Sequence, residues 1–180
     1  MAKSDRKTID RVFILLGIAM AVTLVVVGSL SWYAYRFADK SVHDALAAQR
    51  VYFPPKGSPG LTPEEFPDLQ KYAGQQVDDG PKAKAYANGF IGRHLQKVAD
   101  GKTYSEVSAL AMKDPTNQSL QQAKQSLFQG ETLRGLLMGS GYAYWTFGQI
   151  ARYAAIAAFA GAASMLGLVL LGARHLRRLK

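Results

Sequence analysis

The chain has 180 residues, no cysteine and a formal net charge of +9. The lack of cysteine excludes disulfides, thiolate metal sites, a cysteine nucleophile and covalently attached haem. The excess positive charge lies in residues 1–11 and 174–180, whereas the middle of the chain is close to charge balance. A basic total can indicate nucleic-acid binding, but basic tails beside apolar segments are typical of membrane topology signals and of contact with anionic lipid. We therefore expect membrane lipids, and no nucleic acid, among the partners.

The first predicted element is a transmembrane helix over residues 12–35. This segment has no charged residue and is bounded by Arg11 and Arg36. At about 1.5 Å per residue it reaches roughly 36 Å, enough to cross a hydrocarbon core of about 30 Å. A cleaved signal peptide is the weaker interpretation, because its apolar region usually has only about 7–15 residues and no small-x-small cleavage site follows here. Residues 1–11 are then a cytoplasmic tail.

A second transmembrane helix is predicted over residues 150–172, whose uncharged stretch is about as long as a spanning helix needs. The tail at 173–180 carries Arg174, Arg177 and Arg178 without an acidic residue. Short, densely basic tails stay in the cytoplasm, so both termini are predicted there and residues 36–149 outside. The sequence thus predicts a multi-pass protein of the cell membrane.

Aromatic residues cluster where both spans meet the outside. A tryptophan–tyrosine belt at the outer membrane interface is predicted from these residues and one nearby arginine: Trp32, Tyr33, Tyr35, Tyr144, Trp145 and Arg152. The alternative is a site where a ligand stacks on the rings.

Small residues within the spans predict close helix packing, since lipid-facing surfaces do not require them. The candidates are Gly17, Ala21, Gly28, Ala157 and Gly161. Packing between the two spans of one chain is the simpler interpretation. Packing against another copy or another membrane protein stays open, so a homo-oligomer is an alternative.

The middle of the chain predicts an extracytoplasmic α-helical domain, because no stretch alternates with a period of two. A continuation of the first helix to residue 49 is expected, followed by a turn-rich break at two prolines. Later helices are expected from Thr62 to Gly74, Pro81 to Gly101, Thr103 to Asp114, about Leu120 to Gln129, and Glu131 to Met138, with a hinge at Gly139–Gly141. Thr62 and Thr103 each start a capping-box pattern that closes three residues later on a glutamate. The fold class is an all-α membrane protein with two transmembrane helices flanking this domain.

Four segments carry a resemblance to a known group of proteins: YFPPKG at 52–57, KYAGQQ at 71–76, AKAYANGFI at 83–91 and GETLRGLL at 130–137. They are similar to small actinobacterial membrane proteins with two spans and an extracytoplasmic helical domain, whose function is uncharacterised. Proteins of this kind are sometimes labelled aromatic ring-opening dioxygenases. That label needs an iron held by several histidines and carboxylates, and His175 is predicted across the membrane from His43 and His94. We do not carry the label over.

No residue pattern predicts catalysis, a metal or a cofactor. His43 and His94 are the only candidate ligands in the outside domain, and His94 is expected to be packed and hydrogen-bonded because it lies on an apolar helix face. The carboxylates of Glu64, Glu65 and Asp68 are explained by the favourable dipole at a helix start. The chain has neither a nucleophile elbow nor a glycine-rich phosphate loop, so no enzyme is predicted.

The predicted function is an interaction or ligand-sensing module whose outside domain binds a partner at the membrane surface. The partner is expected to be another membrane or extracytoplasmic protein. Because the tail after the second span is short, we expect any signal to pass to the cytoplasm through this partner. The alternative is a homo-oligomeric pore, which the absence of a polar stripe along the spans disfavours. An enzyme is the third hypothesis, which metal binding by the outside domain would support.

Overall fold

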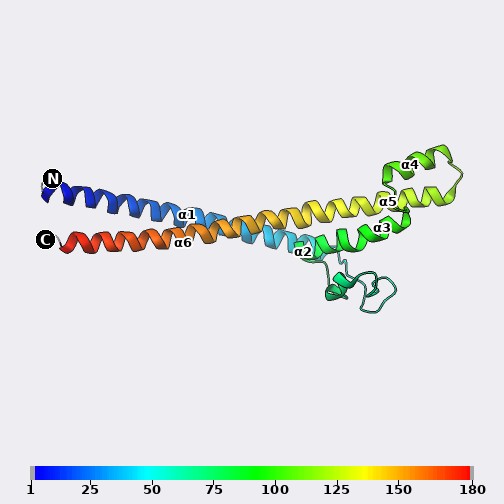
Figure 1. Ribbon diagram of the computed structural model, residues 1–180, viewed down its shortest axis with the longest axis horizontal. Coiled ribbons are helices and arrows are strands. Elements are labelled where there is room, and N and C mark those ends of the chain that lie inside the picture. Colours follow the sequence, from blue (N-terminus) through cyan, green and yellow to red (C-terminus); the bar gives the residue numbers. More distant parts are fainter. Residues whose placement is uncertain (1–2, 179–180) are drawn as a thin grey trace. The chain divides into compact units, whose positions relative to one another are not determined.

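The computed structural model of the protein describes residues 3–178, with side chains described from Lys7 onward. Within this range the protein is all-α and has no β-strand, which confirms the all-α part of the predicted class; a single antiparallel bridge joins Tyr52 to Gln76. The chain divides into two compact units. The first, the helix pair, comprises the chain up to Phe37 and from Phe147 onward. The second, the helical domain, is Ala38–Thr146 (Figure 1).

The helix pair is built from most of α1 (Lys3–Ala48) and most of α6 (Tyr144–Arg178), whose remaining residues belong to the helical domain. α1 confirms that the first helix continues well beyond residue 35. α6 follows without a break from α5 (Gln118–Leu136) and the π-helical turn η3 (Leu137–Ala143). Among the described residues, two helices are long and apolar enough to cross a membrane, and only 17% of the most apolar window of each is buried.

The two helices contact each other through a seven-residue repeat of small and apolar side chains. A set of buried or half-buried positions alternates at spacings of three and four: Ile14, Gly17, Ala21, Leu24 and Gly28 on α1, and Ala155, Ala158, Ala162, Met165 and Val169 on α6. Gly161, next to Ala162, is also half-buried. This spacing is that of a left-handed coiled coil, in which the same stripe of each helix faces its partner along the contact.

At two glycines of this contact a Cβ would force a neighbouring side chain to shift, because the helices approach closely. A Cβ at Gly17 would lie 2.7 Å from Cγ2 of Val169, and one at Gly28 would lie 2.8 Å from Cε1 of Phe159. Gly161 is less crowded, with Cδ1 of Leu24 at 3.4 Å. Gly17, Gly28 and Gly161 therefore face the other helix of the pair, and Ala21 is buried.

Ala157 differs from the other predicted packing residues. It is exposed on α6 and lies outside the repeat, whereas its neighbours Ala155 and Ala158 are buried. Ala157 and Gly161 are four residues apart, but the repeat on α6 advances in steps of three and four residues and includes Ala158 instead of Ala157. Ala157 thus adds nothing to the α1–α6 contact. That Ala157 packs against another copy of the chain or another membrane protein stays a prediction.

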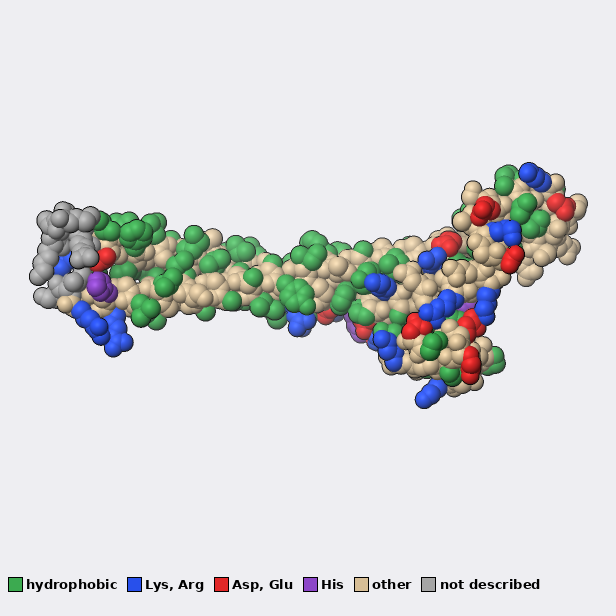
Figure 2. Space-filling model, in the orientation of Figure 1, with side chains coloured by type: hydrophobic (Ala, Val, Ile, Leu, Met, Phe, Trp, Pro, Cys, Tyr) green, Lys and Arg blue, Asp and Glu red, His purple; other side chains and the backbone are tan. Residues whose placement is uncertain are grey.

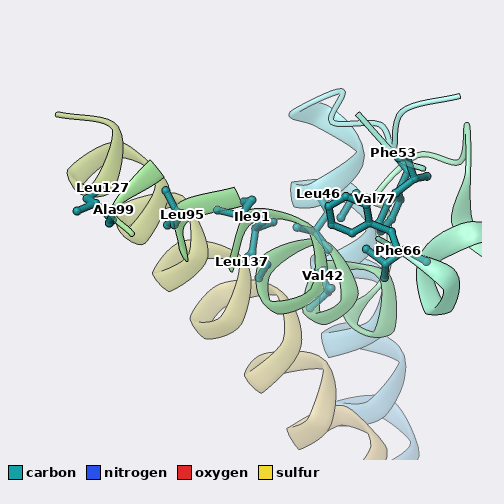
Figure 3. Close-up of a cluster of buried hydrophobic side chains, with 14 of the residues drawn as sticks. Val42, Leu46, Phe53, Phe66, Val77, Ile91, Leu95, Ala99, Leu127 and Leu137 are labelled. Atoms are coloured by element: carbon teal, nitrogen blue, oxygen red, sulfur yellow. The ribbon is translucent and has the colours of Figure 1, made fainter. Parts of the chain in front are cut away.

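The helical domain contains four further helical segments. They are the 3₁₀ helix η1 (Pro67–Tyr72), a continuous helix formed by α2 (Gly80–Lys84), the π-helical turn η2 (Ala85–Ile91) and α3 (Gly92–Val98), then α4 (Tyr104–Lys113), and α5 with η3. Their core is apolar, and its largest fully buried side chains are Phe53, Phe66, Leu61, Leu69 and Leu137 (Figure 3). The non-helical segment before η1 supplies several of these side chains, so it is fixed by burial rather than by secondary structure.

Side-chain caps fix where the helices of the domain begin. Asp79 accepts a hydrogen bond from the backbone N–H of Lys82 (2.8 Å) with Pro81 in the first turn. Thr103 and Glu106 form the reciprocal capping box that their spacing predicts. Asn117 accepts from the N–H of Leu120 (3.2 Å) and starts α5.

Three expectations for the domain are wrong. The separate helices expected over about Leu120 to Gln129 and Glu131 to Met138 are one continuous helix, α5 with η3. The helix expected from Thr62 does not form: one turn closes by the Phe66 N–H to Thr62 C=O bond, and a 3₁₀ helix begins only at Pro67. The ring of Pro67 disfavours the α conformation at Phe66, whose φ is −126° and ψ 54°. The hinge expected at Gly139–Gly141 is also absent, because these residues lie inside the continuous π-helical turn η3.

Candidate functional site

A cavity of about 500 Å³ opens in the helical domain between η1, the α2–η2 helix and the end of η3. Three of its walls are aromatic and several are aliphatic; the lining residues are Asp68, Leu69, Lys71, Tyr72, Pro81, Lys84, Ala85, Asn88, Gly89, Tyr142 and Trp145. A mostly apolar cavity with a few convergent polar groups is the usual form of a small-molecule site. We call it the lysine–tyrosine cavity.

Trp145 forms one wall because a glycine lies beneath it. A Cβ at Gly80 would fall 2.4 Å from Cγ and 2.5 Å from Cβ of Trp145, so the indole lies directly on the first turn of α2. Tyr142, one turn earlier, stacks on Trp145 with ring centroids 6.1 Å apart and an interplanar angle of 23°. Both rings are therefore held against the domain, and the third aromatic wall, Tyr72, stacks on buried Phe53 at 5.2 Å.

Two lysines supply the positive charge of the cavity. The ammonium of Lys84 lies 4.6 Å from the ring centroid of Tyr142 and donates a hydrogen bond to its hydroxyl oxygen (3.2 Å). This hydrogen bond, with the added charge of Lys84, lowers the pKa of Tyr142 below its ordinary value. Lys71 lies 4.9 Å from the ring centroid of Tyr72. In the described part of the chain, neither lysine forms an ion pair with a carboxylate.

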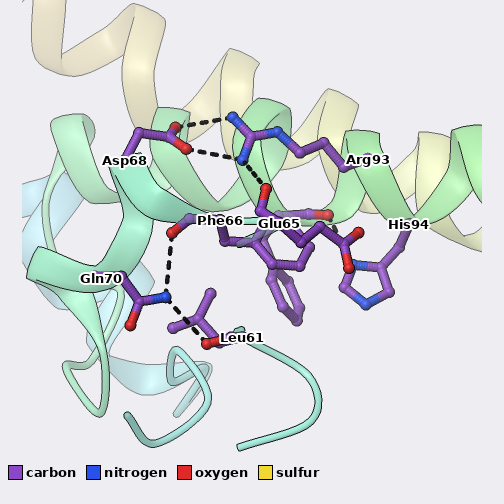
Figure 4. A network of polar contacts seen from close by, with 8 residues as sticks. Leu61, Glu65, Phe66, Asp68, Gln70, Arg93 and His94 are labelled. Atoms are coloured by element: carbon purple, nitrogen blue, oxygen red, sulfur yellow. Dashed lines mark hydrogen bonds and ion pairs between the residues drawn. The ribbon is translucent and has the colours of Figure 1, made fainter. Parts of the chain in front are cut away.

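The one carboxylate of the lining is already neutralised. Asp68 accepts two hydrogen bonds from the guanidinium of Arg93, at 2.8 and 2.9 Å, and these bonds lower the pKa of Asp68 (Figure 4). Arg93 also donates to the backbone C=O of Glu65 (3.1 Å). This network ties η1 to α3 and so fixes Leu69 and Tyr72 at the cavity. The charge left for a ligand is that of Lys71 and Lys84.

Both π-helical turns of the domain contribute to the cavity. η2 supplies Ala85, Asn88 and Gly89, and η3 supplies Tyr142. The turns contact each other where the amide nitrogen of Asn88 donates to Sδ of Met138 (3.6 Å). An inserted residue in a helix re-aims the side chains around it, and such turns occur frequently at functional sites. Residue spacing alone gives no signal for them, and the cavity was not predicted.

The aromatic residues predicted for a membrane interface fall into different environments. Trp32, Tyr33 and Tyr144 are exposed, and the ring of Tyr35 lies 5.6 Å from the guanidinium of Arg152 within the helix pair. Trp145 instead belongs to the wall of the lysine–tyrosine cavity. Of these five rings, that of Trp145 alone lines the cavity; the aromatic belt and its alternative, a ligand-stacking site, both stay predictions.

The remaining predicted residues are the three arginines of the C-terminal tail. Arg174, Arg177 and Arg178 are all exposed near the end of α6. They are available as topology determinants, and that role stays a prediction.

The two histidines of the domain serve packing and hydrogen bonding. Nδ1 of His94 lies 3.0 Å from the backbone oxygen of Phe90, and its ring stacks on Phe66 at 5.5 Å. Nδ1 of His43 lies 3.1 Å from the backbone oxygen of Asp78. Within residues 3–178 no group of three or more histidine and carboxylate side chains is arranged to hold a metal ion.

Comparisons of the chain with protein-family models, with curated proteins and with solved structures found no match. The function is therefore inferred from the residues of this chain alone.

Proposed function

We propose that this chain is an integral membrane protein whose helical domain lies outside the cell and binds a small organic anion. The support for membrane insertion is the exposure of the helix pair. Large aliphatic and aromatic side chains of both helices are exposed, among them Phe13, Leu15, Leu16, Val22, Leu30, Leu168, Leu170 and Leu171. Soluble monomers rarely expose contiguous apolar surface beyond a few hundred Å², and a bilayer would cover it.

The proposed topology has both termini in the cytoplasm. Within the helix pair α1 and α6 are antiparallel, so the first described turns of α1 lie beside the last described turns of α6 (Figure 1). The basic residues Lys7, Arg11, Arg174, Arg177 and Arg178 all lie at that end, which is the arrangement of charge that keeps a membrane end inside the cell.

The single observation that carries the ligand class is the pairing of free cations with aromatic walls in the lysine–tyrosine cavity. Lys71 and Lys84 present two ammonium groups beside tyrosine rings, and both carboxylate oxygens of Asp68 accept hydrogen bonds from Arg93 rather than from either lysine. An anionic group would pair with the lysines, while a flat apolar body would stack on Tyr142 and Trp145. The ligand class is therefore an aromatic or apolar organic anion, sensed outside the membrane.

The two tryptophans of the chain make this proposal testable by fluorescence. In a Trp32→Phe background only Trp145 emits, and it lies in the cavity wall. Benzoate and phenyl phosphate, added to the solubilised full chain, are expected to change the Trp145 emission saturably, whereas neutral benzamide is not.

Matched lysine variants decide whether the cavity is responsible. Lys84→Met is expected to raise the apparent Kd at least about ten-fold, the effect of losing one charge-assisted hydrogen bond. Lys113→Met removes the same charge from the end of α4, outside the cavity, and is expected to leave the Kd unchanged. Equal effects of the two variants, or equal response to benzoate and benzamide, would refute the anion site.

A further inference from the structure

A second cavity lies within the helix pair, between the first turns of α1 and the last turns of α6. It has a volume of about 510 Å³. Its lining combines three cations with four apolar residues: Lys7, Arg11 and Arg177, with Ile14, Leu15, Ala173 and Leu176. None of the described residues that line it is acidic. We call it the basic groove.

The cations face the groove from both helices. Lys7 and Arg11 are four residues apart on α1 and so share one face, one turn above the other, while Arg177 comes from α6. In the described part of the chain none of the three forms an ion pair with a carboxylate. Asp10, the acidic residue closest in sequence, lines a different cavity together with His175. Figure 2 shows basic side chains gathered at this end of the helix pair.

The apolar part of the lining follows directly on the cations along each helix. Ile14 and Leu15 lie one turn beyond Arg11, and Ala173 and Leu176 precede Arg177. Three cations alone would suit any small anion. A groove that passes from cations to aliphatic side chains suits a ligand whose anionic head carries a hydrocarbon chain.

We propose that the basic groove binds one anionic phospholipid, with its phosphate at Lys7, Arg11 and Arg177 and an acyl chain along Ile14, Leu15, Ala173 and Leu176. The proposal rests on the membrane insertion proposed above and adds a defined lipid site to it. Basic cavities between membrane helices on the cytoplasmic side bind phospholipid head groups in this way. The groove differs from the general attraction of basic tails to anionic lipid because Arg174 and Arg178, which carry the same charge and also lie in the last turns of α6, do not line it.

The test uses the full chain in a neutral detergent, where no charged bilayer surface attracts the tails. Native mass spectrometry measures bound phosphatidylglycerol against phosphatidylcholine, with inorganic phosphate as a third arm. Arg11→Gln/Arg177→Gln is expected to weaken phosphatidylglycerol binding roughly 30-fold, since each basic residue near an anionic head group contributes a factor of about five. The charge-matched variant Arg174→Gln/Arg178→Gln is expected to stay within about two-fold of the unchanged protein.

Each outcome supports or overturns the site. Equal losses in the two variants, or equal binding of phosphatidylcholine, would overturn it, and binding of inorganic phosphate as tight as that of phosphatidylglycerol would reduce it to an anion site without a lipid. Arg11→Lys/Arg177→Lys preserves the charges and is expected to retain the lipid, which separates loss of the site from loss of the fold. Recovery of the unchanged chain in carbonate-washed membranes distinguishes the two proposals: absence there overturns the membrane function itself, whereas presence without selective lipid binding overturns the groove alone.

Discussion

The contact between Gly80 and Trp145 is the most sharply defined steric requirement of the lysine–tyrosine cavity. In Gly80→Ala the new methyl group would meet Cβ and Cγ of Trp145 at 2.5 and 2.4 Å. These atoms are next to the backbone, so no rotation of the indole about its outer bonds removes the overlap. α6 or α2 must shift, and the cavity wall shifts with it.

The cost follows from overpacking a well-filled site, about 1–3 kcal/mol. For a domain of roughly 100 residues each kcal/mol lowers Tm by about 4–8 °C, so a fall of roughly 4–24 °C is expected. The assay is thermal unfolding of the solubilised full chain, followed by Trp145 emission in the Trp32→Phe background. The same spectra report whether the indole has moved, since its emission maximum depends on exposure.

Gly135→Ala is the matched control. Gly135 lies inside α5 and nothing surrounds its absent Cβ within 4 Å. Alanine is better than glycine in a helix interior by about 1 kcal/mol, so this variant is expected to be unchanged or more stable. Equal Tm values for Gly80→Ala and the unchanged protein would refute the described contact of Trp145 with α2.

Three further predictions follow from the packing and the ion pairs. Phe53→Ala, which empties one of the largest fully buried sites, should destabilise the helical domain by about 3–5 kcal/mol, whereas Tyr52→Ala at an exposed neighbour should cost far less; chemical denaturation compares them. Gly28→Leu should separate the helix pair, measured as easier unfolding in SDS by about 1–3 kcal/mol, while Gly167→Leu, with open space around it, should not. Arg93 lowers the pKa of Asp68 in the folded protein, so the ion pair contributes its full stability at pH values above the ordinary carboxyl pKa. This stability is lost as the pH falls from the ordinary pKa through the lowered pKa of Asp68 in the folded protein. The effect should stay below about 1 kcal/mol since the pair is largely exposed, and it should vanish in Asp68→Asn; a pH series with identical loss in both proteins would contradict the assignment.

The features of the fold that depend on local chemistry were predictable from the sequence. The capping box at Thr103 and Glu106 needs only neighbouring residues, and so does the proline in the first turn of α2. The same kind of argument failed at Thr62. There the capping pattern was present, but Pro67 constrained Phe66, and burial of Leu61 and Phe66 fixed an irregular path instead.

The features that depend on helix register or on distant contacts were not predictable. The small-residue pattern identified Gly17 and Gly28, but choosing Ala158 over Ala157 requires the seven-residue repeat of both helices together. Glycines 139 and 141 resembled a hinge, yet a π-helical turn accommodates them without a break. The lysine–tyrosine cavity joins Lys71, Lys84 and Trp145 from three separate elements, and no local pattern links them.

The central claim is that the helical domain lies outside the cell while the termini lie inside it, and cysteine labelling tests this topology most directly. Because the chain has no cysteine, Ser105→Cys in α4 and Thr8→Cys near the start of α1 each create a single thiol. A membrane-impermeant maleimide applied to intact cells is expected to label the Ser105→Cys variant at once and the Thr8→Cys variant only after lysis. Labelling of the Thr8→Cys variant in intact cells with protection of the Ser105→Cys variant would contradict the account.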